Sequence, residues 1–255
     1  MPEPVLVERD GGTLVITLNR PHLRNAMDSA TAHAVADALD ELDADPTLVV
    51  GILTGAGGTF SAGMDLKAFL LTGERPEVAG RGLAGLTERP PATPLIAAVE
   101  GHAVAGGCEL VLACDLVVAA DDAAFGLPEV RRGLIAGSGG LVRLPRLVPP
   151  QIAMEHALTG RPMTAVDAHR WGLVNQLTSP GGALAGARAL AAEIAANGPL
   201  AVRATKKLLS ESPTWPPAEV WARQTALLLE VVDSADAKEG AAAFVEKRAP
   251  VWRGE

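Results

Sequence analysis

Short apolar runs alternate with turn residues along the first half of the chain. Residues 5–8 and 13–18 are β-branched or alternate in polarity on either side of a glycine-containing turn, which predicts a β-hairpin. An Ala/Leu/Asp-rich stretch running to residue 42 follows Asp28 and Ser29, and either side chain can cap a helix there.

Further apolar runs lack polar alternation and therefore predict strands that are buried on both faces. These runs lie at 48–54, 95–99 and 116–120. Residues 108–114 predict a short buried helix between two of them. The repeated order of strand, turn and short helix is typical of an α/β fold.

After about residue 138 the apolar positions take helical spacing, and proline and glycine separate the segments. The predicted helices span 141–148, 151–158, 165–171, 183–197, 200–210, 218–232 and 235–246. The helix over 218–232 carries more leucine and valine than one core face requires. We therefore expect this helical tail to cover a partner subunit as well as its own core.

The composition allows a large core and argues against nucleic-acid binding. The chain has 255 residues, 48% of them hydrophobic, so it needs neither disulfides nor a metal to fold. Its net charge is −8, and the nearest approach to a basic stripe is Lys206-Lys207, which we interpret as a solvated helix face. An anionic ligand would have to be held locally, by helix N-termini and a few cations.

Nothing in the sequence predicts a metal site, a resident cofactor or a membrane segment. Cys108 and Cys114 lie in apolar surroundings, where free cysteines usually act as small hydrophobic residues. The first residues lack the basic and apolar regions of a signal peptide, and no apolar run approaches the roughly 18 residues of a membrane span. We expect a cytoplasmic protein.

Two glycine-rich segments are candidates for binding a ligand through backbone N–H groups. In the segment 59–67, small residues would let the backbone approach a ligand and leave the Met64 N–H free to donate. In the segment 101–109, a glycine pair opens a helix, and the Gly106 N–H has no partner within that helix. Two converging N–H groups would form an oxyanion hole. Ordinary glycine-rich connections remain the alternative for both segments.

Two glutamates and a third glycine-rich turn follow. Glu109 lies one turn into the short helix, and Glu129 follows a turn-forming proline. Carboxyl groups in apolar surroundings have raised pKa values, which suits acid–base catalysis near neutral pH. Gly137, in the turn 133–140, is positioned to hold a water or an acyl chain. Each glutamate also has a structural alternative, because acidic residues favour helix starts.

In this order, these segments resemble the enoyl-CoA hydratase/isomerase (crotonase) family, near its enoyl-CoA hydratase and carnitinyl-CoA dehydratase branches. The most informative strings are FSAGMDLK at 60–67, AGGCEL at 105–110 and FGLPE at 125–129. Shorter matches lie at 16–21, 25–27, 158–161, 171–175 and 244–248. The resemblance covers nearly the whole chain.

The resemblance implies a crotonase-like spiral of ββα units over residues 1–195 and a C-terminal helical trimerisation region over 196–255. It implies a homo-oligomer, either a trimer or a dimer of trimers. The implied reaction is the reversible addition of water to a 2-enoyl-CoA thioester, a hydro-lyase activity. Coenzyme A is then part of the substrate, so no separate cofactor and no metal are expected.

The resemblance also implies a role for each candidate residue. Glu109 and Glu129 would be catalytic, Met64 and Gly106 would form the oxyanion hole, and Gly137 would help to place the water. The implied coenzyme A contacts are Arg24, Ala62, Asp65, Leu66, Lys67 and, from a neighbouring subunit, Lys247.

Other activities remain open on this fold. Ala136 stands where many relatives have proline, and His22 replaces a frequent lysine, so acyl preference is not fixed by the sequence. The segments 139–150 and 250–254 look like the carnitinyl-CoA dehydratase branch, so dehydration or isomerisation of a functionalised acyl-CoA is the main alternative. A non-catalytic RNA-binding role is disfavoured by the net charge and by an aromatic content of only 3%.

Overall fold

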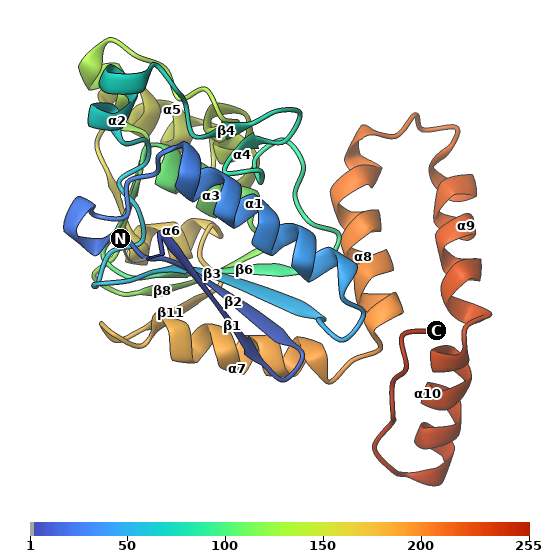
Figure 1. Ribbon diagram of the computed structural model, residues 1–255. Coiled ribbons are helices and arrows are strands. Elements are labelled where there is room, and N and C mark those ends of the chain that lie inside the picture. Colours follow the sequence, from blue (N-terminus) through green and yellow to red (C-terminus); the bar gives the residue numbers. More distant parts are fainter. Residues whose placement is uncertain (1–2) are drawn as a thin grey trace.

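The computed structural model describes residues 3–255, and its central element is a six-stranded sheet (Figure 1). The strand order is β1-β2-β3-β6-β8-β11. The first two strands form the predicted antiparallel hairpin, and each later neighbour pairs in parallel. The strands are β1 (Val5–Asp10), β2 (Thr13–Leu18), β3 (Val50–Gly55), β6 (Leu95–Val99), β8 (Leu116–Ala120) and β11 (Gln176–Thr178).

Helices cover both faces of this sheet (Figure 1), which explains why its central strands β3, β6 and β8 are almost entirely buried and mainly apolar. On one face, Leu14 and Ile16 belong to the core shared with α1 (Ser29–Ala44), which begins after the N-cap Asp28 as predicted. On the other face, Val15 packs in a separate cluster that includes alanines of α7 (Ala183–Ala195). The predicted α/β fold is confirmed.

A smaller sheet lies next to the main one and carries the candidate chemistry. Its strands are β10 (Met163–Thr164), β9 (Ala124–Gly126) and β7 (His102–Val104), in that order. β7 leads directly into α3 (Gly106–Ala113), in which every residue is buried, as the sequence predicts for 108–114. A two-stranded hairpin, β4 (Glu77–Val78) and β5 (Gly82–Leu83), and the 3-10 helices η1 (Pro21–Leu23) and η2 (Pro128–Arg132) complete this region.

Six further helices follow the candidate site or flank it. They are α2 (Leu66–Thr72), α4 (Gly140–Leu147), α5 (Pro150–Thr159), α6 (Ala165–Trp171), α8 (Pro199–Glu211) and, after the 3-10 helix η3 (Ser212–Thr214), α9 (Val220–Val232). The chain ends with α10 (Ala235–Glu246) and an extended segment. The helices predicted after residue 138 are confirmed with small differences at their ends. Helix α2 was not predicted.

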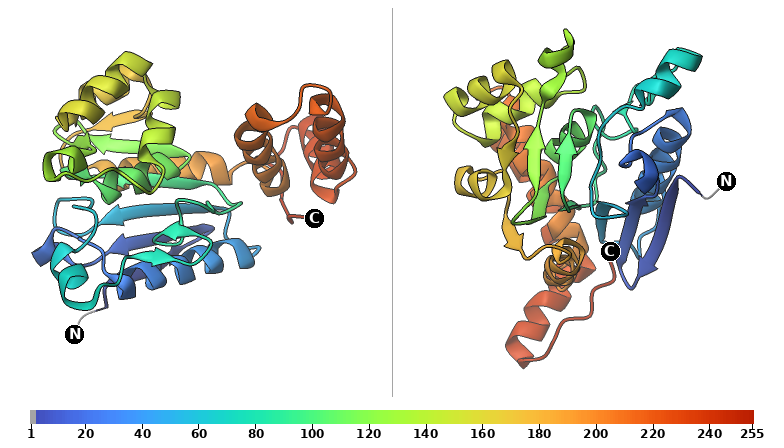
Figure 2. Two further views of the ribbon diagram at one scale, coloured as in Figure 1. Left: turned by 90° about the horizontal axis from the view of Figure 1, so that it is seen from above. Right: turned by 90° about the vertical axis from the view of Figure 1, so that its left-hand side faces the viewer.

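Helices α8–α10 project sideways from the body of the molecule (Figures 1 and 2). Helix α8 is joined to the core by Lys206, whose Nζ lies 2.5 Å from an Asp115 carboxylate oxygen and donates to the Thr93 carbonyl. The interpretation of Lys206 as part of a solvated helix face was therefore wrong. Its ammonium group is bound by Asp115 and Thr93, which are far from it in the sequence. Helix α9 packs against α8, and α10 against α9. The domain boundary at residue 195 stays a prediction.

The extended C-terminal segment runs back along the tail. The Trp252 indole N–H donates to the Ala196 carbonyl, and the buried Asp236 carboxylate accepts the N–H groups of Arg253 and Gly254. Among residues 3–255, no helix is both long enough and apolar enough to span a bilayer.

Candidate active site

Three backbone segments lie side by side at the start of α3. Ser61 donates its N–H to the His102 carbonyl and accepts the Val104 N–H, so the loop after β3 is fixed against β7. On its other side, Met27 donates to the Gly63 carbonyl and accepts the Asp65 N–H, which brackets Met64. The sequence placed residues 59–67 and 101–109 in separate segments, and the fold joins them.

The two predicted amide donors come together at this junction. Gly63 adopts φ +87°, and a Cβ built on it would lie 2.8 Å from the Gly106 nitrogen, so only glycine fits there. Gly106 is the first residue of α3, and Ala105 before it takes an unusual φ of +53° that turns the chain into the helix. Across residues 3–255, neither the Met64 nor the Gly106 N–H has a backbone acceptor. Both N–H groups are therefore without a backbone acceptor in the described structure, as an oxyanion hole would require.

Glu109 is almost completely buried, and a loop from later in the chain holds its carboxylate. Its Oε1 accepts the N–H of Ser138 at 2.7 Å and that of Gly140 at 3.0 Å. Burial raises the pKa of Glu109, while the two amides and the nearby Arg143 guanidinium oppose that rise. A fixed carboxylate with a raised pKa is suited to accept a proton near neutral pH.

Glu129 enters the same neighbourhood from η2. Its Oε2 is buried and has no hydrogen-bond partner within the described part of the chain. Burial raises the pKa of Glu129, and the negative charge of Glu109 raises it further, against the attraction of Arg132. The two carboxyl groups therefore interact electrostatically, as the sequence-based hypothesis requires. An unpartnered buried oxygen of this kind is ready to donate or accept a proton from a ligand.

The residues predicted to contact coenzyme A gather near the amide pair, with one exception. The Arg24 carbonyl accepts the Ala62 N–H at 3.0 Å, and Leu66 and Lys67 are exposed at the start of α2. Lys247 ends α10, in the projecting tail on the opposite side of the molecule from α2 (Figure 1).

Asp65 has a structural role that the sequence analysis did not identify. Its carboxylate caps α2 by accepting the N–H groups of Lys67 and Ala68, and it pairs with Arg20 at 3.0 Å. Arg20 also lies 3.1 Å from Asp28 and donates to the Ala26 carbonyl. It therefore links the segment before α1 to the segment before α2, which contains Met64. Sequence reasoning missed Arg20, because an isolated arginine after a strand gives no signal of its distant partners.

Gly137 lies in the loop that binds Glu109, but it is its neighbours that make the contact. Gly137 is exposed, and a Cβ on it would have only one atom within 4 Å, at 3.9 Å. Gly140, in contrast, packs directly on Glu109, since a Cβ there would lie 2.9 Å from the Glu109 Cγ. The glycine pattern identified the right loop without showing which amides are used.

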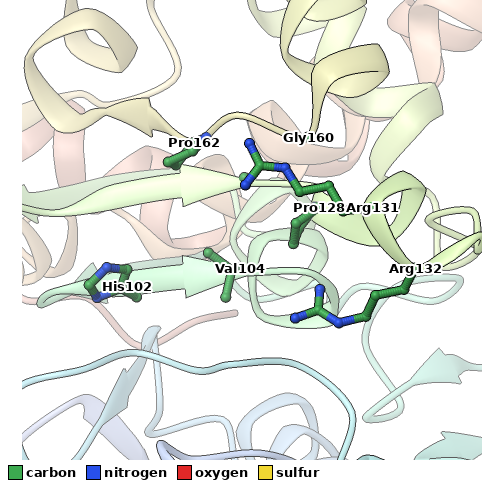
Figure 3. Close-up of a pocket in the computed structure, with 8 residues that line it drawn as sticks. His102, Val104, Pro128, Arg131, Arg132, Gly160 and Pro162 are labelled. Carbon is green, nitrogen blue, oxygen red and sulfur yellow. The ribbon is translucent and has the colours of Figure 1, made fainter.

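A hollow of about 370 Å³ lies beside this site, behind η2 (Figure 3). His102 and Val104 project into it from β7, and Arg131 and Arg132 reach in from η2. Pro128, which precedes Glu129, forms part of its wall. The side chains of Glu109 and Glu129 do not line this hollow, so it is separate from the amide pair.

Known proteins resemble this chain along its whole length. A carnitinyl-CoA dehydratase from Salmonella typhi is 44% identical over the full length of both chains. A solved enoyl-CoA hydratase from Mycobacterium marinum is 59% identical, covers 99% of this chain and all of its own, and superposes with a TM-score of 0.97. A carnitinyl-CoA hydratase structure from Mycobacterium avium is 44% identical over the full length of both chains, with a TM-score of 0.80. Residues 8–255 match the enoyl-CoA hydratase/isomerase family, and the chain belongs to that family.

Proposed function

We propose that this crotonase-family enzyme adds water reversibly to the double bond of a 2-enoyl-CoA thioester. The observation that carries the proposal is the combination of two unpartnered amides with two interacting carboxyl groups of raised pKa. The amides of Met64 and Gly106 would bind the thioester oxygen, which gains negative charge as the β-carbon is attacked. Each such donor typically contributes about 3 kcal/mol to the transition state.

The proton balance assigns one step to each glutamate. Glu109, ionised and fixed by two amides, takes a proton from water while the water oxygen bonds to the β-carbon. Glu129, protonated, gives its proton to the α-carbon as the enolate collapses. Burial, together with the charge of Glu109, raises the pKa of Glu129 and so favours its protonated form, and the proposed mechanism has the two groups begin in opposite protonation states. The reverse sequence removes water.

Binding of the coenzyme A portion is proposed for the surface around the start of α2. The backbone of Ala62 and Leu66 borders the amide pair, and the exposed cations Arg24 and Lys67 suit phosphate groups. This assignment needs no resident cofactor, since coenzyme A arrives with the substrate. The expected location of the protein is the cytoplasm.

The proposed assembly is a homotrimer or a dimer of trimers. The tail displays large apolar side chains that its own chain leaves uncovered, including Trp221, Leu228, Leu229 and Phe244. Several large exposed apolar side chains in one helical region favour an interface there. In such an assembly, Lys247 from a neighbouring subunit would lie near a bound coenzyme A.

The second candidate function is dehydration or isomerisation of a functionalised acyl-CoA. It is supported by the carnitinyl-CoA dehydratases, which are 44% and 43% identical to this chain along its whole length. It uses the same amides and glutamates and differs in the acyl group that is accepted.

A panel of CoA thioesters separates the two candidates. Purified enzyme is incubated with crotonyl-CoA, longer 2-enoyl-CoAs, a 3-enoyl-CoA and carnitinyl-CoA, and the absorbance of the conjugated thioester is followed. Fast loss of absorbance with simple 2-enoyl-CoAs is the expected result. Turnover of carnitinyl-CoA alone would favour the second candidate, and no turnover of any ester would exclude both.

A further inference from the structure

Arg143, on α4, is a half-buried cation close to the candidate site, and its side chain is held by a turn from much earlier in the chain. Its Nη2 donates to the Thr87 carbonyl at 2.5 Å, and Thr87 is itself buried. The end of the guanidinium lies beside Gly139, close to the position that a Cβ on this glycine would take. Arg143 therefore connects the N-terminal turn of α4 to the turn after β5.

Arg143 lies in the first turn of the helix that directly follows the Glu109-binding loop. Gly139 lies between Ser138 and Gly140, whose two N–H groups hold the Glu109 carboxylate. Gly139 has φ +94°, so this turn depends on glycine and has little freedom to rearrange. Because Gly140 is the first residue of α4, a shift of that helix would move the Gly140 amide and, with it, the carboxylate.

Through Thr87, Arg143 is also connected to Leu83, the residue that packs against Gly106. The hydroxyl of Thr87 accepts the Leu83 N–H at 2.9 Å, which closes the turn after β5. The Leu83 side chain packs against Gly106, since a Cβ on Gly106 would lie 2.9 Å from Leu83 Cδ2. Thr87 thus connects Arg143 to the packing beneath the Gly106 amide.

We propose that Arg143 is a positioning residue that ties the Glu109-binding loop to the turn supporting Gly106, so that the carboxylate and the amide donor keep a fixed mutual placement. The inference rests on the proposed function, in which Glu109 is the base and Gly106 an oxyanion donor. Neither Arg143 nor Thr87 needs to touch the substrate.

The charge of Arg143 also acts on the pKa of Glu109. The charged neighbours of Glu109 are Arg143 on α4 and Glu129 on η2. The titratable neighbours of Arg143 are Glu109, Cys114 after α3 and Arg146 on the same helix. The positive charge of Arg143 opposes the burial that raises the pKa of Glu109. Removing that charge should therefore raise the pKa of Glu109 further and leave less ionised base at a given pH.

The test compares Arg143→Gln, Arg143→Lys and the exposed control Arg146→Gln, with hydration of a 2-enoyl-CoA measured across pH. For Arg143→Gln we expect kcat to fall on the order of tenfold to a hundredfold, with KM nearly unchanged and the acid limb of kcat/KM moved to higher pH. Arg143→Lys should restore the acid limb and only part of kcat, because a flexible ammonium keeps the charge but not the planar guanidinium that holds the Thr87 carbonyl. Arg146→Gln should match the wild type.

Hydrogen–deuterium exchange of the same proteins tests the tie without relying on turnover. Segments 136–141 and 82–88 should both exchange faster in Arg143→Gln and should match the wild type in Arg146→Gln. Unchanged exchange in both segments, or a folded Arg143→Gln enzyme with wild-type kcat and pH profile, would overturn the proposal. Failure of the proposed function would appear differently, as a wild-type enzyme that hydrates no 2-enoyl-CoA yet shows the same exchange response.

Discussion

Gly63 lies so close to Gly106 that a methyl group on Gly63 would come within 2.8 Å of the Gly106 amide nitrogen. This contact joins the loop after β3 to the first turn of α3, two segments that are about 40 residues apart in the sequence. Met64 directly follows Gly63, so the contact places its N–H in the neighbourhood of the Gly106 N–H. The proposed oxyanion hole therefore depends on the absence of a Cβ at Gly63.

Gly63→Ala should abolish most activity. The new methyl group must displace the Gly106 amide, and loss of one oxyanion donor typically lowers kcat on the order of 10²- to 10³-fold. Gly58→Ala is the matched control, because Gly58 has a similar φ of +74° but open space around it. Gly58→Ala should lose about 1–2 kcal/mol of stability from backbone strain, and Gly63→Ala should lose more because its methyl group also meets the backbone of Gly106, as measured by urea unfolding. Equal activity of the two variants would mean that the Gly63–Gly106 contact is not part of the site.

Glu129→Gln should stabilise the fold at neutral and alkaline pH. Since the folded pKa of Glu129 is raised above its ordinary value of 4.5, the native state holds more protons than the unfolded state between those two values. Stability then falls as pH rises through that window, and the cost is absent well below pH 4.5. The Tm of Glu129→Gln should exceed that of the wild type at pH 8 and match it at pH 4.

Calorimetry at both pH values provides the measurement, with Glu74→Gln at the exposed end of α2 as the control for removing one charge. A Glu129→Gln variant with a lower Tm at pH 8 would show that the carboxylate is stabilised in the fold rather than held there at a cost.

Arg20→Gln should weaken both the fold and the site. Arg20 pairs with Asp28 and Asp65 in a partly buried cluster beside Met64, and its loss leaves the Asp65 carboxylate without its counter-charge. We expect a loss of about 2 kcal/mol in urea unfolding, together with reduced kcat. Arg9→Gln is the matched control, since Arg9 also pairs with two carboxylates but on the exposed surface, where solvent screening should make the loss clearly smaller than for Arg20→Gln. Equal losses in the two variants would contradict this account of the cluster.

Leu228→Asp should reduce the size of the assembly. Leu228 is 54% exposed on α9 within the single chain, and a charge there would oppose burial against a neighbouring subunit. Sedimentation velocity should show a trimer or hexamer for the wild type and smaller species for the variant. Glu230→Gln, on the same helix, should leave the assembly unchanged. A wild-type monomer would refute the proposed assembly.

The sequence predicted those elements whose signals are local. The strands over 95–99 and 116–120 and the helices over 165–171 and 235–246 have the predicted bounds, because apolar runs there end at glycine, proline or a capping side chain. Strands β7, β9 and β10 have three residues or fewer and exist only through pairing with distant segments, so local patterning does not reveal them. Helix α2 was missed although Asp65 and Gly73 mark its ends, because seven residues are too few to show a clear helical period.

The candidate site was predictable as a set of residue types and not as a set of contacts. Glu109 and the loop after η2 were both identified, yet the amides that bind the carboxylate belong to Ser138 and Gly140, while Gly137 is exposed. Arg143 was not identified at all, because an arginine on a short helix usually indicates a solvated face. Its burial depends on Thr87, from a turn 56 residues earlier.

The central claim is that both glutamates are needed for hydration. The most direct test is kcat for a 2-enoyl-CoA, measured with Glu109→Gln and with Glu129→Gln beside the wild type. Each variant should lose on the order of 10²- to 10⁴-fold in kcat, because each removes one of two proton transfers while its amide keeps the shape of the side chain. Wild-type kcat in either variant would contradict the mechanism.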